Sequence, residues 1–357
     1  MIGSDSLSLG EGKTTVLPLR SIAKQFGLAE IFAKAEWINP TGSYKDRIAI
    51  ETIRDALRCG HRGWIGTSSG NGGASMSAYG ARAGMQGFLC VAADAPKEKL
   101  QSIVPYGTRL LPMSNIGMRE MDMIKVLAAE FNLKLAVTAY RYNPEGMAGA
   151  ETIGTELSAQ GEFTHIYVPT GGGGLLAAIA RGMSHQAGKA PKIICAQPLG
   201  CGPIARFINE EISSPHIEKC QSDISGLQLP SPPDGLRAAD AVRNTGGWGC
   251  LVTDDEAWYL QDQLAQHEGV FVEPASALAV AGIVNDFRAG RLTTSDRPVA
   301  ILTGSGLKDL GRFTQHTSGK PKTSSFSDLR TVLESALSNN QVRDDFQSNR
   351  GAIKNRT

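Results

Sequence analysis

The chain has 357 residues, of which 41% are apolar and 20% charged, and its formal net charge is +1. This length and apolar content allow a sizeable core, in two domains or one large α/β unit. The small net charge gives no indication that nucleic acid or an anionic membrane is the main partner. Glycine is over-represented, with 41 residues in the chain, well above the usual level of roughly 7%. Several of these glycines are clustered, which is typical of loops whose backbone approaches a ligand closely.

The six cysteines do not indicate a metal site, because none of them stands in a C-x-x-C pair. Cys90 and Cys195 fall in apolar segments that we predict as buried strands, where cysteine usually serves as a small apolar residue. The first residues lack the basic and apolar regions of a signal peptide, and no run of about 18 apolar residues occurs. We therefore expect a cytoplasmic protein without a membrane span and without a bound metal.

Short apolar runs alternate with helical patterns along the chain. We predict strands at residues 31–36, 64–67, 88–91, 109–112, 134–137, 165–169, 192–197 and 299–302. We predict helices at residues 46–57, 73–82, 118–131, 148–160, 175–185, 254–268 and 274–288. Strands and helices that alternate at this spacing predict mostly parallel sheets with helices on both faces.

The strands divide into two groups along the chain. One group predicts a sheet within residues 50–145, and the other a sheet within residues 150–320 together with the N-terminal segment. We therefore expect a large domain of residues 1–45 and 150–320, and a small mobile domain of residues 46–149. Residues 213–247 are rich in Ser, Pro, Gly and Asp, which predicts a loop. Residues 321–357 are polar and basic and predict a partly disordered tail, with one helical patch at 326–337.

Four consecutive glycines, Gly171, Gly172, Gly173 and Gly174, follow an apolar strand and precede an apolar helix. Consecutive glycines let several backbone N–H groups converge, and the start of the helix adds the positive end of its dipole. A tight turn between a strand and a helix does not need four adjacent glycines. The loop therefore predicts a cradle for one phosphate group.

Two nucleotide-binding patterns are disfavoured. Residues 172–177 match the G-x-G-x-x-A dinucleotide fingerprint, which needs an acidic residue at the end of the next strand, where Gln197 stands. Residues 10–15 resemble a P-loop, but Leu7 occupies the position of its first glycine and no apolar strand precedes it. Neither NAD nor a nucleoside triphosphate is therefore the expected ligand.

A polar loop follows the predicted strand at 64–67. Its Ser68, Ser69 and Asn71 offer two hydroxyls and an amide at the start of a helix. This combination could hold a phenolate and a carboxylate of a ligand. The same residues are also common helix caps, so the loop alone does not decide between the two roles.

A second polar loop follows the last predicted strand and contains Thr303 and Ser305. Ligands of open α/β sheets bind at the carboxyl ends of the strands, which is where these two hydroxyls stand. A capped turn without a ligand explains the same residues equally well.

Lys45 stands in residues 39–47, a run of small turn-forming residues that leads into a predicted helix. Such a loop presents the lysine amine to a ligand. In a pocket, the pKa of a lysine amine can drop, and the amine can then attack a carbonyl group to form a Schiff base. A surface lysine followed by an Asp–Arg pair is the commoner case, but the phosphate cradle and the two polar loops favour a ligand here.

A lysine, a phosphate cradle and two polar loops together resemble the fold-type II pyridoxal-phosphate enzymes, the threonine synthase and cysteine synthase superfamily. The nearest likeness is to threonine synthase. The resemblance covers roughly residues 8–312 and rests on seven motifs in family order: SLGEGKT, NPTGSYKDR, TSSGNGGAS, NPEGMAGAET, PTGGGG, GVFVEPASA and LTGSGLKD. It implies pyridoxal phosphate as the cofactor. It also implies a tryptophan synthase β-like fold of two domains, each with a mostly parallel sheet flanked by helices.

The resemblance assigns roles to the residues of the motifs. Lys45 is implied as the Schiff-base lysine and general base, Asn71 as the partner of the cofactor's 3′ oxygen, and Gly171–Gly174 as the phosphate cradle. Thr303, with Ser305 as the less favoured candidate, is implied as the partner of the pyridine nitrogen. A neutral hydroxyl there implies an unprotonated nitrogen and a mild electron sink, which suits elimination and replacement.

The chain departs from threonine synthase near the implied substrate position. Ser68 and Ser69 are implied to lie near the substrate carboxylate, but Gly72 stands where the family usually has threonine. Gly146 stands where the family has an arginine for the phosphate of phosphohomoserine. A contact of that kind is worth roughly 1.5–3 kcal/mol, so its loss should weaken a phosphorylated substrate. Arg141 is near in sequence and could replace it.

The resemblance implies β- or γ-elimination or replacement on an O-activated, phosphorylated or acylated amino acid, carried out by a homodimer. Three alternatives stay open. They are threonine synthase acting on O-phosphohomoserine, a cysteine-synthase-like β-replacement, and a non-catalytic ligand-binding relative. The expected partner is a small amino-acid substrate, with neither nucleic acid nor a membrane.

Overall fold

The structure is a computed structural model that describes residues 4–95, 100–184, 190–314 and 325–338. The chain divides into two units, Met1–Asp309 and Leu310–Thr357, and each is described by itself. Within the described residues, no helix is both long enough and apolar enough to cross a membrane.

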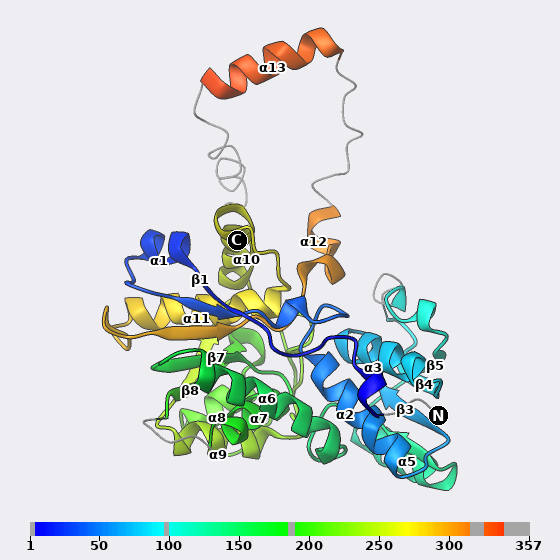
Figure 1. Cartoon of the computed structure of the whole chain (residues 1–357). Helices are drawn as coiled ribbons and strands as arrows, with labels where there is room; N and C mark the ends of the chain where they lie inside the picture. Colours follow the sequence, from blue (N-terminus) through cyan, green and yellow to red (C-terminus); the bar gives the residue numbers. More distant parts are fainter. Residues whose placement is uncertain (1–3, 96–99, 185–189, 315–324, 339–357) are drawn as a thin grey trace. The chain divides into compact units, whose positions relative to one another are not determined.

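One sheet of the first unit has six strands in the spatial order β1-β2-β10-β7-β8-β9 (Figure 1). Its strands are β1 (Val16–Pro18), β2 (Phe32–Lys34), β7 (His165–Pro169), β8 (Lys192–Pro198), β9 (Gly249–Val252) and β10 (Pro298–Ile301). β1 pairs antiparallel with β2, with Val16 opposite Lys34, and all other pairs are parallel.

The other sheet has four parallel strands in the order β5-β4-β3-β6. Its strands are β3 (Gly63–Thr67), β4 (Gln86–Ala92), β5 (Arg109–Met113) and β6 (Leu133–Leu135). The predicted pair of mostly parallel sheets is confirmed. β1 and β9 were not predicted: β1 ends in proline, and β9 directly follows the segment that was predicted as a loop. Both are edge strands, where short length and proline are tolerated.

Helices flank both sheets of the first unit. They are α1 (Arg20–Phe26), α2 (Lys45–Arg58), α3 (Asn71–Arg82), α5 (Met118–Glu130), α6 (Pro144–Gln160), α7 (Gly174–Met183), α8 (Pro203–Ile208), α9 (Gly235–Asn244), α10 (Asp254–Gln263) and α11 (Pro274–Arg288). The predicted loop at 213–247 is wrong in part, because α9 lies within it. A proline- and serine-rich run precedes α9, which is why the sequence pattern did not indicate where the helix begins. Its Ala238, Ala239 and Val242 are buried against α7 and β8.

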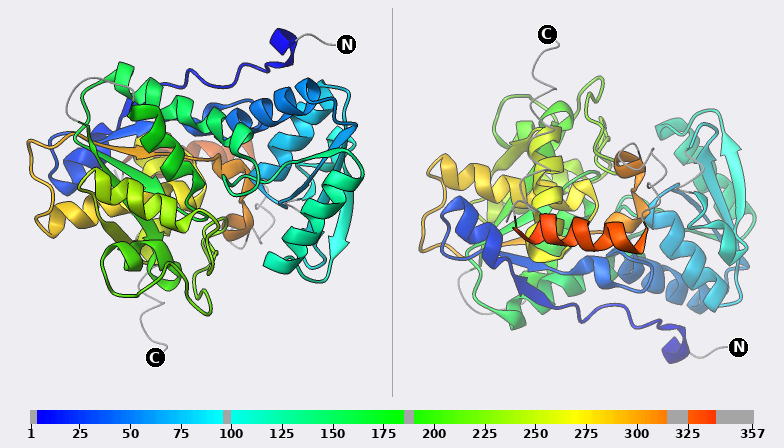
Figure 2. Two further views of the ribbon diagram at one scale, coloured as in Figure 1. Left: turned by 90° about the horizontal axis from the view of Figure 1, so that it is seen from below. Right: turned by 90° about the horizontal axis from the view of Figure 1, so that it is seen from above.

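Alternate residues of the central strands face the two sides of the six-stranded sheet, as the strand period of two requires. Tyr167 of β7 and Ile194 of β8 join the cluster under α1, α10 and α11. Ile166 and Ile193 join the cluster under α6, α7, α8 and α9. Figure 2 shows these two helical layers from opposite sides, with α11 in yellow and α8 and α9 in yellow-green. Both faces are therefore covered, and β7 and β8 are buried at every position except Lys192.

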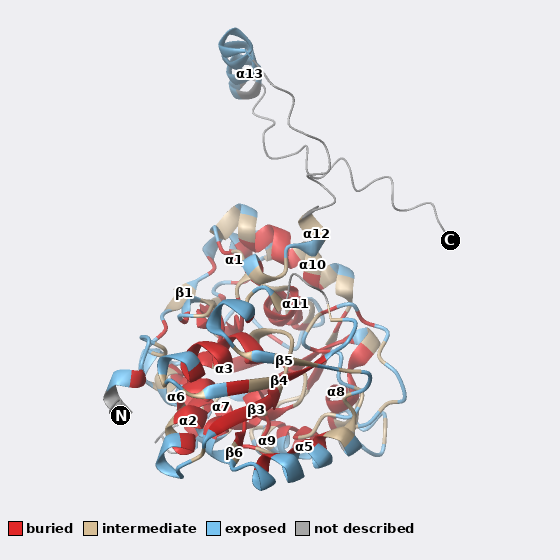
Figure 3. Cartoon of the chain, turned by 90° about the vertical axis from the view of Figure 1, so that its right-hand side faces the viewer, coloured by how far each residue is buried: buried red, intermediate tan, exposed pale blue. Residues whose placement is uncertain are grey.

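The four-stranded sheet is covered in the same way. Trp64 and Leu89 pack with residues of α2 and α3, whereas Ile65, Cys90 and Leu135 pack with the inner face of α5. β3 and most of β4 are buried, whereas the edge strand β5 and the outer face of α5 are partly or fully exposed (Figure 3). The predicted burial of Cys90 and Cys195 is confirmed.

The second unit contains α12 (Gly311–Thr314) and α13 (Phe326–Ser338). The predicted helical patch at 326–337 is confirmed by α13, whose described residues are all exposed (Figure 3). The remainder of the predicted disordered tail lies outside the described residues. The division of the first unit into a large domain and a small mobile domain stays a prediction.

Candidate active site

Five predicted or newly observed site segments follow the carboxyl ends of strands. α2 begins at Lys45 after the loop that leaves β2, and α3 begins at Asn71 after β3. The four glycines follow β7, Thr303 follows β10, and Thr138 comes soon after β6. Strands that run parallel within each sheet bring such ends to one edge, so chain segments far apart in sequence contribute to one site.

The Lys45 amine is half-buried and makes a specific contact. Its Nζ donates a hydrogen bond of 2.7 Å to the Thr138 hydroxyl and lies 4.7 Å from the centre of the Tyr44 ring. The Tyr44 N–H donates to the Thr303 carbonyl at 3.0 Å, which ties the lysine loop to the end of β10. A backbone hydrogen bond therefore joins the Lys45 loop to the Thr303 loop, as expected if both belong to one site. Thr138 was not predicted as a site residue.

The side chains of Asn71 and Thr303 both contact the carboxylate of Glu273, a residue that was not predicted as part of the site. The Asn71 side-chain amide donates to Glu273 Oε2 at 2.8 Å, and the Thr303 hydroxyl donates to Glu273 Oε1 at 2.7 Å. The Ser276 hydroxyl lies 3.1 Å from the Thr303 hydroxyl. Burial raises the pKa of Glu273 above its ordinary value, against the lowering effect of these hydrogen bonds.

Lys308, a charged residue that was not predicted as part of the site, contacts the same group of residues. The Lys308 amine, at the end of η6 (Gly306–Lys308), donates to Asn71 Oδ1 at 3.0 Å. Burial lowers the pKa of Lys308, while the carboxylates of Asp46 and Glu273 oppose that shift. Ser305 accepts from the Leu307 N–H at 3.3 Å and so caps the η6 turn.

The glycine loop leads into α7 and leaves no room for a side chain at Gly171 or Gly173. A Cβ on Gly171 would lie 2.6 Å from the Gly226 carbonyl oxygen, and one on Gly173 would lie 2.7 Å from the Asp234 carbonyl oxygen. Gly173 also has a φ of +91°, a conformation that other residues rarely adopt. The segment Gly226–Asp234 thus walls the cradle and requires glycines at these two positions.

Asp234 is a further site residue that was not predicted. Its carboxylate accepts the backbone N–H groups of Tyr140 at 2.8 Å and Arg141 at 3.2 Å. A Cβ on Gly174 would lie 2.9 Å from the same carboxylate. Burial raises the pKa of Asp234, and the nearby charge of Lys45 acts in the opposite direction.

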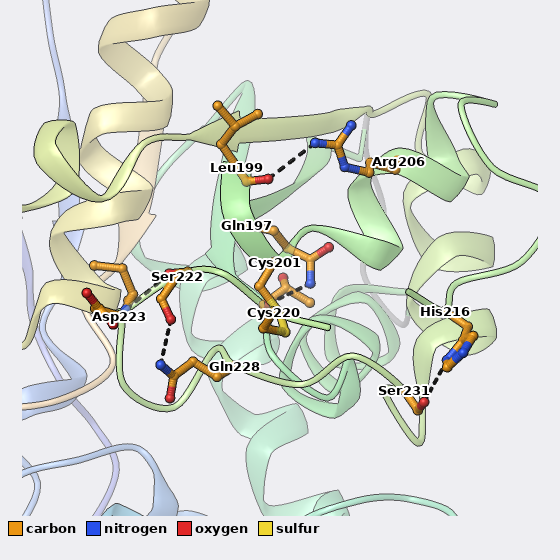
Figure 4. The surroundings of a disulfide bond; sticks show 12 residues. Gln197, Leu199, Cys201, Arg206, His216, Cys220, Ser222, Asp223, Gln228 and Ser231 are labelled. Atoms are coloured by element: carbon orange, nitrogen blue, oxygen red, sulfur yellow. Dashed lines mark hydrogen bonds between the residues drawn. A yellow bond between two sulfur atoms is a disulfide. The ribbon is translucent and has the colours of Figure 1, made fainter. Parts of the chain in front are cut away.

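A disulfide joins Cys201 to Cys220, which lies shortly before the walling segment in the chain (Figure 4). Cys201 ends η4 (Leu199–Cys201), just beyond β8, and the Gln221 N–H donates to the Gly200 carbonyl at 2.8 Å. The sequence spacing of these two cysteines did not predict their pairing. The disulfide therefore links the end of β8 to the segment that leads to the wall of the glycine loop.

Ser68 and Gly72 lie beside the lysine contact. A Cβ on Gly72 would be 3.2 Å from the Ser68 hydroxyl and 3.6 Å from the Thr138 methyl group. Ser68 accepts from the Gly70 N–H at 3.3 Å, and Ser69 is the next residue of the same loop. Position 72 is therefore next to both Ser68 and Thr138, and a side chain there would contact the Ser68 hydroxyl closely.

Gly146 and Arg141 do not form a phosphate-binding pair in the structure. A Cβ on Gly146 would lie 2.2 Å from the Thr52 hydroxyl and 2.3 Å from the Asn143 amide nitrogen, so position 146 is closed by packing. The Arg141 side chain is exposed, with its guanidinium 5.6 Å from the Tyr142 ring. The substrate-binding role of Arg141 stays a prediction.

A buried cluster of charges holds the first turn of α2, where Lys45 stands. Arg47 contacts Glu36 at 2.8 Å and Glu156 at 2.6 Å, and Lys34 contacts Glu156 at 2.6 Å. Lys34 and Glu36 have fully buried side chains, and that of Arg47 is 3% exposed. Two cations and two carboxylates balance one another in this cluster, which joins β2, α2 and α6.

Two sheets with polar side chains gathered at the carboxyl ends of their parallel strands define an α/β enzyme that acts on a small molecule. The family "Pyridoxal-phosphate dependent enzyme" matches residues 7–304 of the chain. The chain is 31% identical to threonine synthase of Methanocaldococcus jannaschii over 316 residues, which cover 86% of this chain and 77% of that protein.

Solved structures agree with this assignment. Serine racemase from Dictyostelium discoideum is 25% identical, has a TM-score of 0.67 and covers 83% of this chain and 92% of its own. The processed form of threonine deaminase isoform 2 from Solanum lycopersicum is 20% identical, has a TM-score of 0.70 and covers 90% of this chain and 82% of its own. The chain belongs to the pyridoxal-phosphate-dependent enzymes. The predicted family, fold class and cofactor are confirmed.

Proposed function

We propose that this enzyme catalyses β- or γ-elimination or replacement on an O-activated amino acid, phosphorylated or acylated at its hydroxyl. The observation that carries the proposal is the Lys45 amine, half-buried and held 2.7 Å from the Thr138 hydroxyl. This amine stands among residues that fit the cofactor and beside the Ser68 loop. The similarity to threonine synthase supports the same class of chemistry.

The residues of the site fit pyridoxal phosphate. Gly171–Gly174 would hold its phosphate, because α7 directs its first N–H groups toward the loop and the surrounding backbone excludes side chains at Gly171 and Gly173. Asn71 would contact the 3′ oxygen of the ring and Thr303 its nitrogen, whereas the Ser305 hydroxyl caps a turn. When bound, the cofactor supplies a carbonyl for the Lys45 amine and a sink for electrons released at the substrate Cα.

Lys45 is the residue placed to move the proton. Its Nζ would accept the proton from the substrate Cα, as a general base, once the amine is free. The Thr138 hydroxyl orients that amine through the hydrogen bond of 2.7 Å. Ser68 and Ser69 would bind the substrate carboxylate from the loop after β3.

Threonine synthase acting on O-phosphohomoserine is the second candidate, and the 31% identity to the Methanocaldococcus jannaschii enzyme favours it. The closed packing around Gly146 weighs against it, because no arginine fits there while Thr52 and Asn143 keep their positions. A cysteine-synthase-like β-replacement does not require that arginine. The cytoplasmic setting and the homodimer stay predictions.

A panel of substrates tests the proposal. The holoenzyme is mixed with O-phosphohomoserine, O-phosphoserine, O-acetylserine, serine and threonine, while phosphate or acetate release and the cofactor spectrum are followed. We expect release from at least one O-activated compound. Turnover of serine or threonine alone would refute the proposal. Phosphate release from O-phosphohomoserine, with threonine as product, would favour the second candidate.

A single variant tests the role of Lys45. Lys45→Ala should abolish turnover and the visible absorbance band of the holoenzyme, because the amine that holds the cofactor and moves the proton is removed. Lys24→Ala, at an exposed lysine of α1, is the matched control and should change neither. Turnover by Lys45→Ala would exclude Lys45 as the catalytic base.

A further inference from the structure

The disulfide between Cys201 and Cys220 stands close, along the chain, to two parts of the glycine loop (Figure 4). Cys201 follows β8, which pairs in parallel with β7, the strand that leads into the four glycines. Cys220 comes a few residues before the segment Gly226–Asp234 that walls those glycines. The disulfide therefore joins the sheet that carries the glycine loop to the segment that covers it.

The walling segment contacts three successive glycines. The carbonyl oxygens of Gly226 and Asp234 lie 2.6 and 2.7 Å from the Cβ positions of Gly171 and Gly173. The Asp234 N–H donates to the Gly172 carbonyl at 2.9 Å. Because these contacts are with the backbone, a displacement of the segment would also displace the N–H groups that we assign to the cofactor phosphate.

Few contacts other than the disulfide hold the chain between Cys220 and the wall. The Gln221 N–H donates to the Gly200 carbonyl at 2.8 Å. The Ser222 hydroxyl and the N–H of the next residue donate to the Asp254 carboxylate at 2.8 and 2.6 Å. Hydrogen bonds near the surface exchange readily with water, so the disulfide is the strongest link at this end of the segment.

The two cysteines differ in their exposure to solvent. Cys201 is fully buried, whereas Cys220 is half-buried. A thiolate from solvent would attack the Cys220 sulfur, break the S–S bond and release the Cys201 thiolate, which takes up a proton. A second thiol would then release Cys220 and form the disulfide of the reagent. Two electrons and two protons thus pass from two thiols to the protein.

We propose that Cys201 and Cys220 form a redox-sensitive site, reduced by small thiols or dithiols, whose oxidation state sets the affinity for the cofactor. In the reducing compartment that we expect for this protein, disulfides are usually transient and redox-sensing rather than structural. The oxidised form holds the wall against the glycines. The reduced form frees the start of the segment, while the buried Leu227 keeps its middle in place. The inference rests on the proposed contact of Gly171–Gly174 with the cofactor phosphate.

Equilibrium dialysis of the apoenzyme against pyridoxal phosphate tests the proposal. One sample stays oxidised, and the other is treated with dithiothreitol, which is removed under argon before dialysis. We expect two additional titratable thiols per chain after this treatment, from the pair in the disulfide. The cofactor Kd should rise about tenfold, as expected if the binding-competent position of the wall falls to about one tenth of the population. Reoxidation with glutathione disulfide should restore the lower Kd.

Variants separate this disulfide from the other cysteines. The double variant Cys201→Ser, Cys220→Ser should bind the cofactor as weakly as the reduced natural protein, with or without dithiothreitol. Cys59→Ser, which removes an exposed free cysteine, should respond to dithiothreitol as the natural protein does.

Three results would overturn the proposal. They are an equal Kd for the oxidised and reduced natural protein, a disulfide that dithiothreitol does not open in the folded protein, and a response to dithiothreitol in the double variant. Gly173→Ala tests the cradle by itself, and if its Kd is unchanged, the phosphate assignment is wrong and the proposal falls with it. Substrate turnover plays no part in these measurements, so they are independent of the substrate assignment.

Discussion

Replacing Glu156 with glutamine should lower the free energy of unfolding by about 3 kcal/mol at pH 7. The Glu156 carboxylate lies 2.6 Å from both the Lys34 amine and the Arg47 guanidinium. Its side chain is 20% exposed, whereas those of both cations are almost fully buried. In Glu156→Gln these two cations would share the single carboxylate of Glu36, which leaves a buried positive charge without a partner.

The magnitude follows from the pKa of Glu156. Burial by itself raises this pKa, but the hydrogen bonds and charges of Arg47 and Lys34 lower it from 4.5 to about 2. That difference corresponds to about 3 kcal/mol of stability at neutral pH. Because the pKa is depressed in the folded protein, the stabilisation is complete well above pH 4.5. It declines as the pH falls, and about half of it is left at pH 3.

Urea unfolding of both proteins between pH 7 and pH 3 measures this effect. The gap in unfolding free energy between the natural protein and Glu156→Gln should narrow as the pH falls, since protonation removes the same charge from the natural protein. Glu334→Gln is the control, because its pair with Arg330 is 65% and 85% exposed and should contribute between 0 and about 1 kcal/mol. A gap that stays constant over this pH range would refute the reasoning.

Three further predictions concern the site. Gly173→Ala should weaken cofactor binding, measured by equilibrium dialysis, because its Cβ meets backbone at 2.7 Å; Gly246→Ala, also at positive φ but with open space around it, should not. Gly72→Thr should lower KM by up to about tenfold, since a hydroxyl added beside the substrate carboxylate contributes roughly 0.5–1.5 kcal/mol, and an unchanged KM would argue against this position. Cys220→Ser should lower the unfolding free energy by about 3 kcal/mol, as expected for the loop that its disulfide closes. A reductant should lower the unfolding free energy of the natural protein by the same amount, and equally that of the control Cys59→Ser, whose cysteine is free. If the natural protein melts at the same temperature with and without reductant, this prediction is wrong.

The parts of the site that could be predicted from the sequence are local motifs. The lysine loop, the glycine loop and the polar loop at Asn71 each follow an apolar strand and precede a helix, so a few adjacent residues carry the signal. The strands and the helix that were missed lack such a local signal. β1 ends in proline, β9 directly follows a segment that was predicted as a loop, and α9 begins after a run of prolines.

The residues that were missed act through contacts between distant parts of the chain. Glu273 meets Asn71 across 202 positions, and Thr138 meets Lys45 across 93. Glu273 and Lys308 stand inside two of the motifs that carry the family resemblance, so a signal was present, but not which neighbour each would contact. Asp234 lay in a segment predicted as loop, and its bonds to two backbone N–H groups require the fold to be known.

Position 146, which bears on the proposed substrate, is a glycine whose surroundings are closely packed. The Asn143 amide donates to the Thr52 hydroxyl at 2.8 Å, and that hydroxyl donates to the Ile48 carbonyl at 2.7 Å. The space that a side chain at position 146 would need is thus occupied by a hydrogen-bonded pair that also caps α6 through the Gly146 N–H. An arginine there would require Thr52 and Asn143 to move together. Under the proposed function, recognition of the leaving group would therefore come from residues other than position 146.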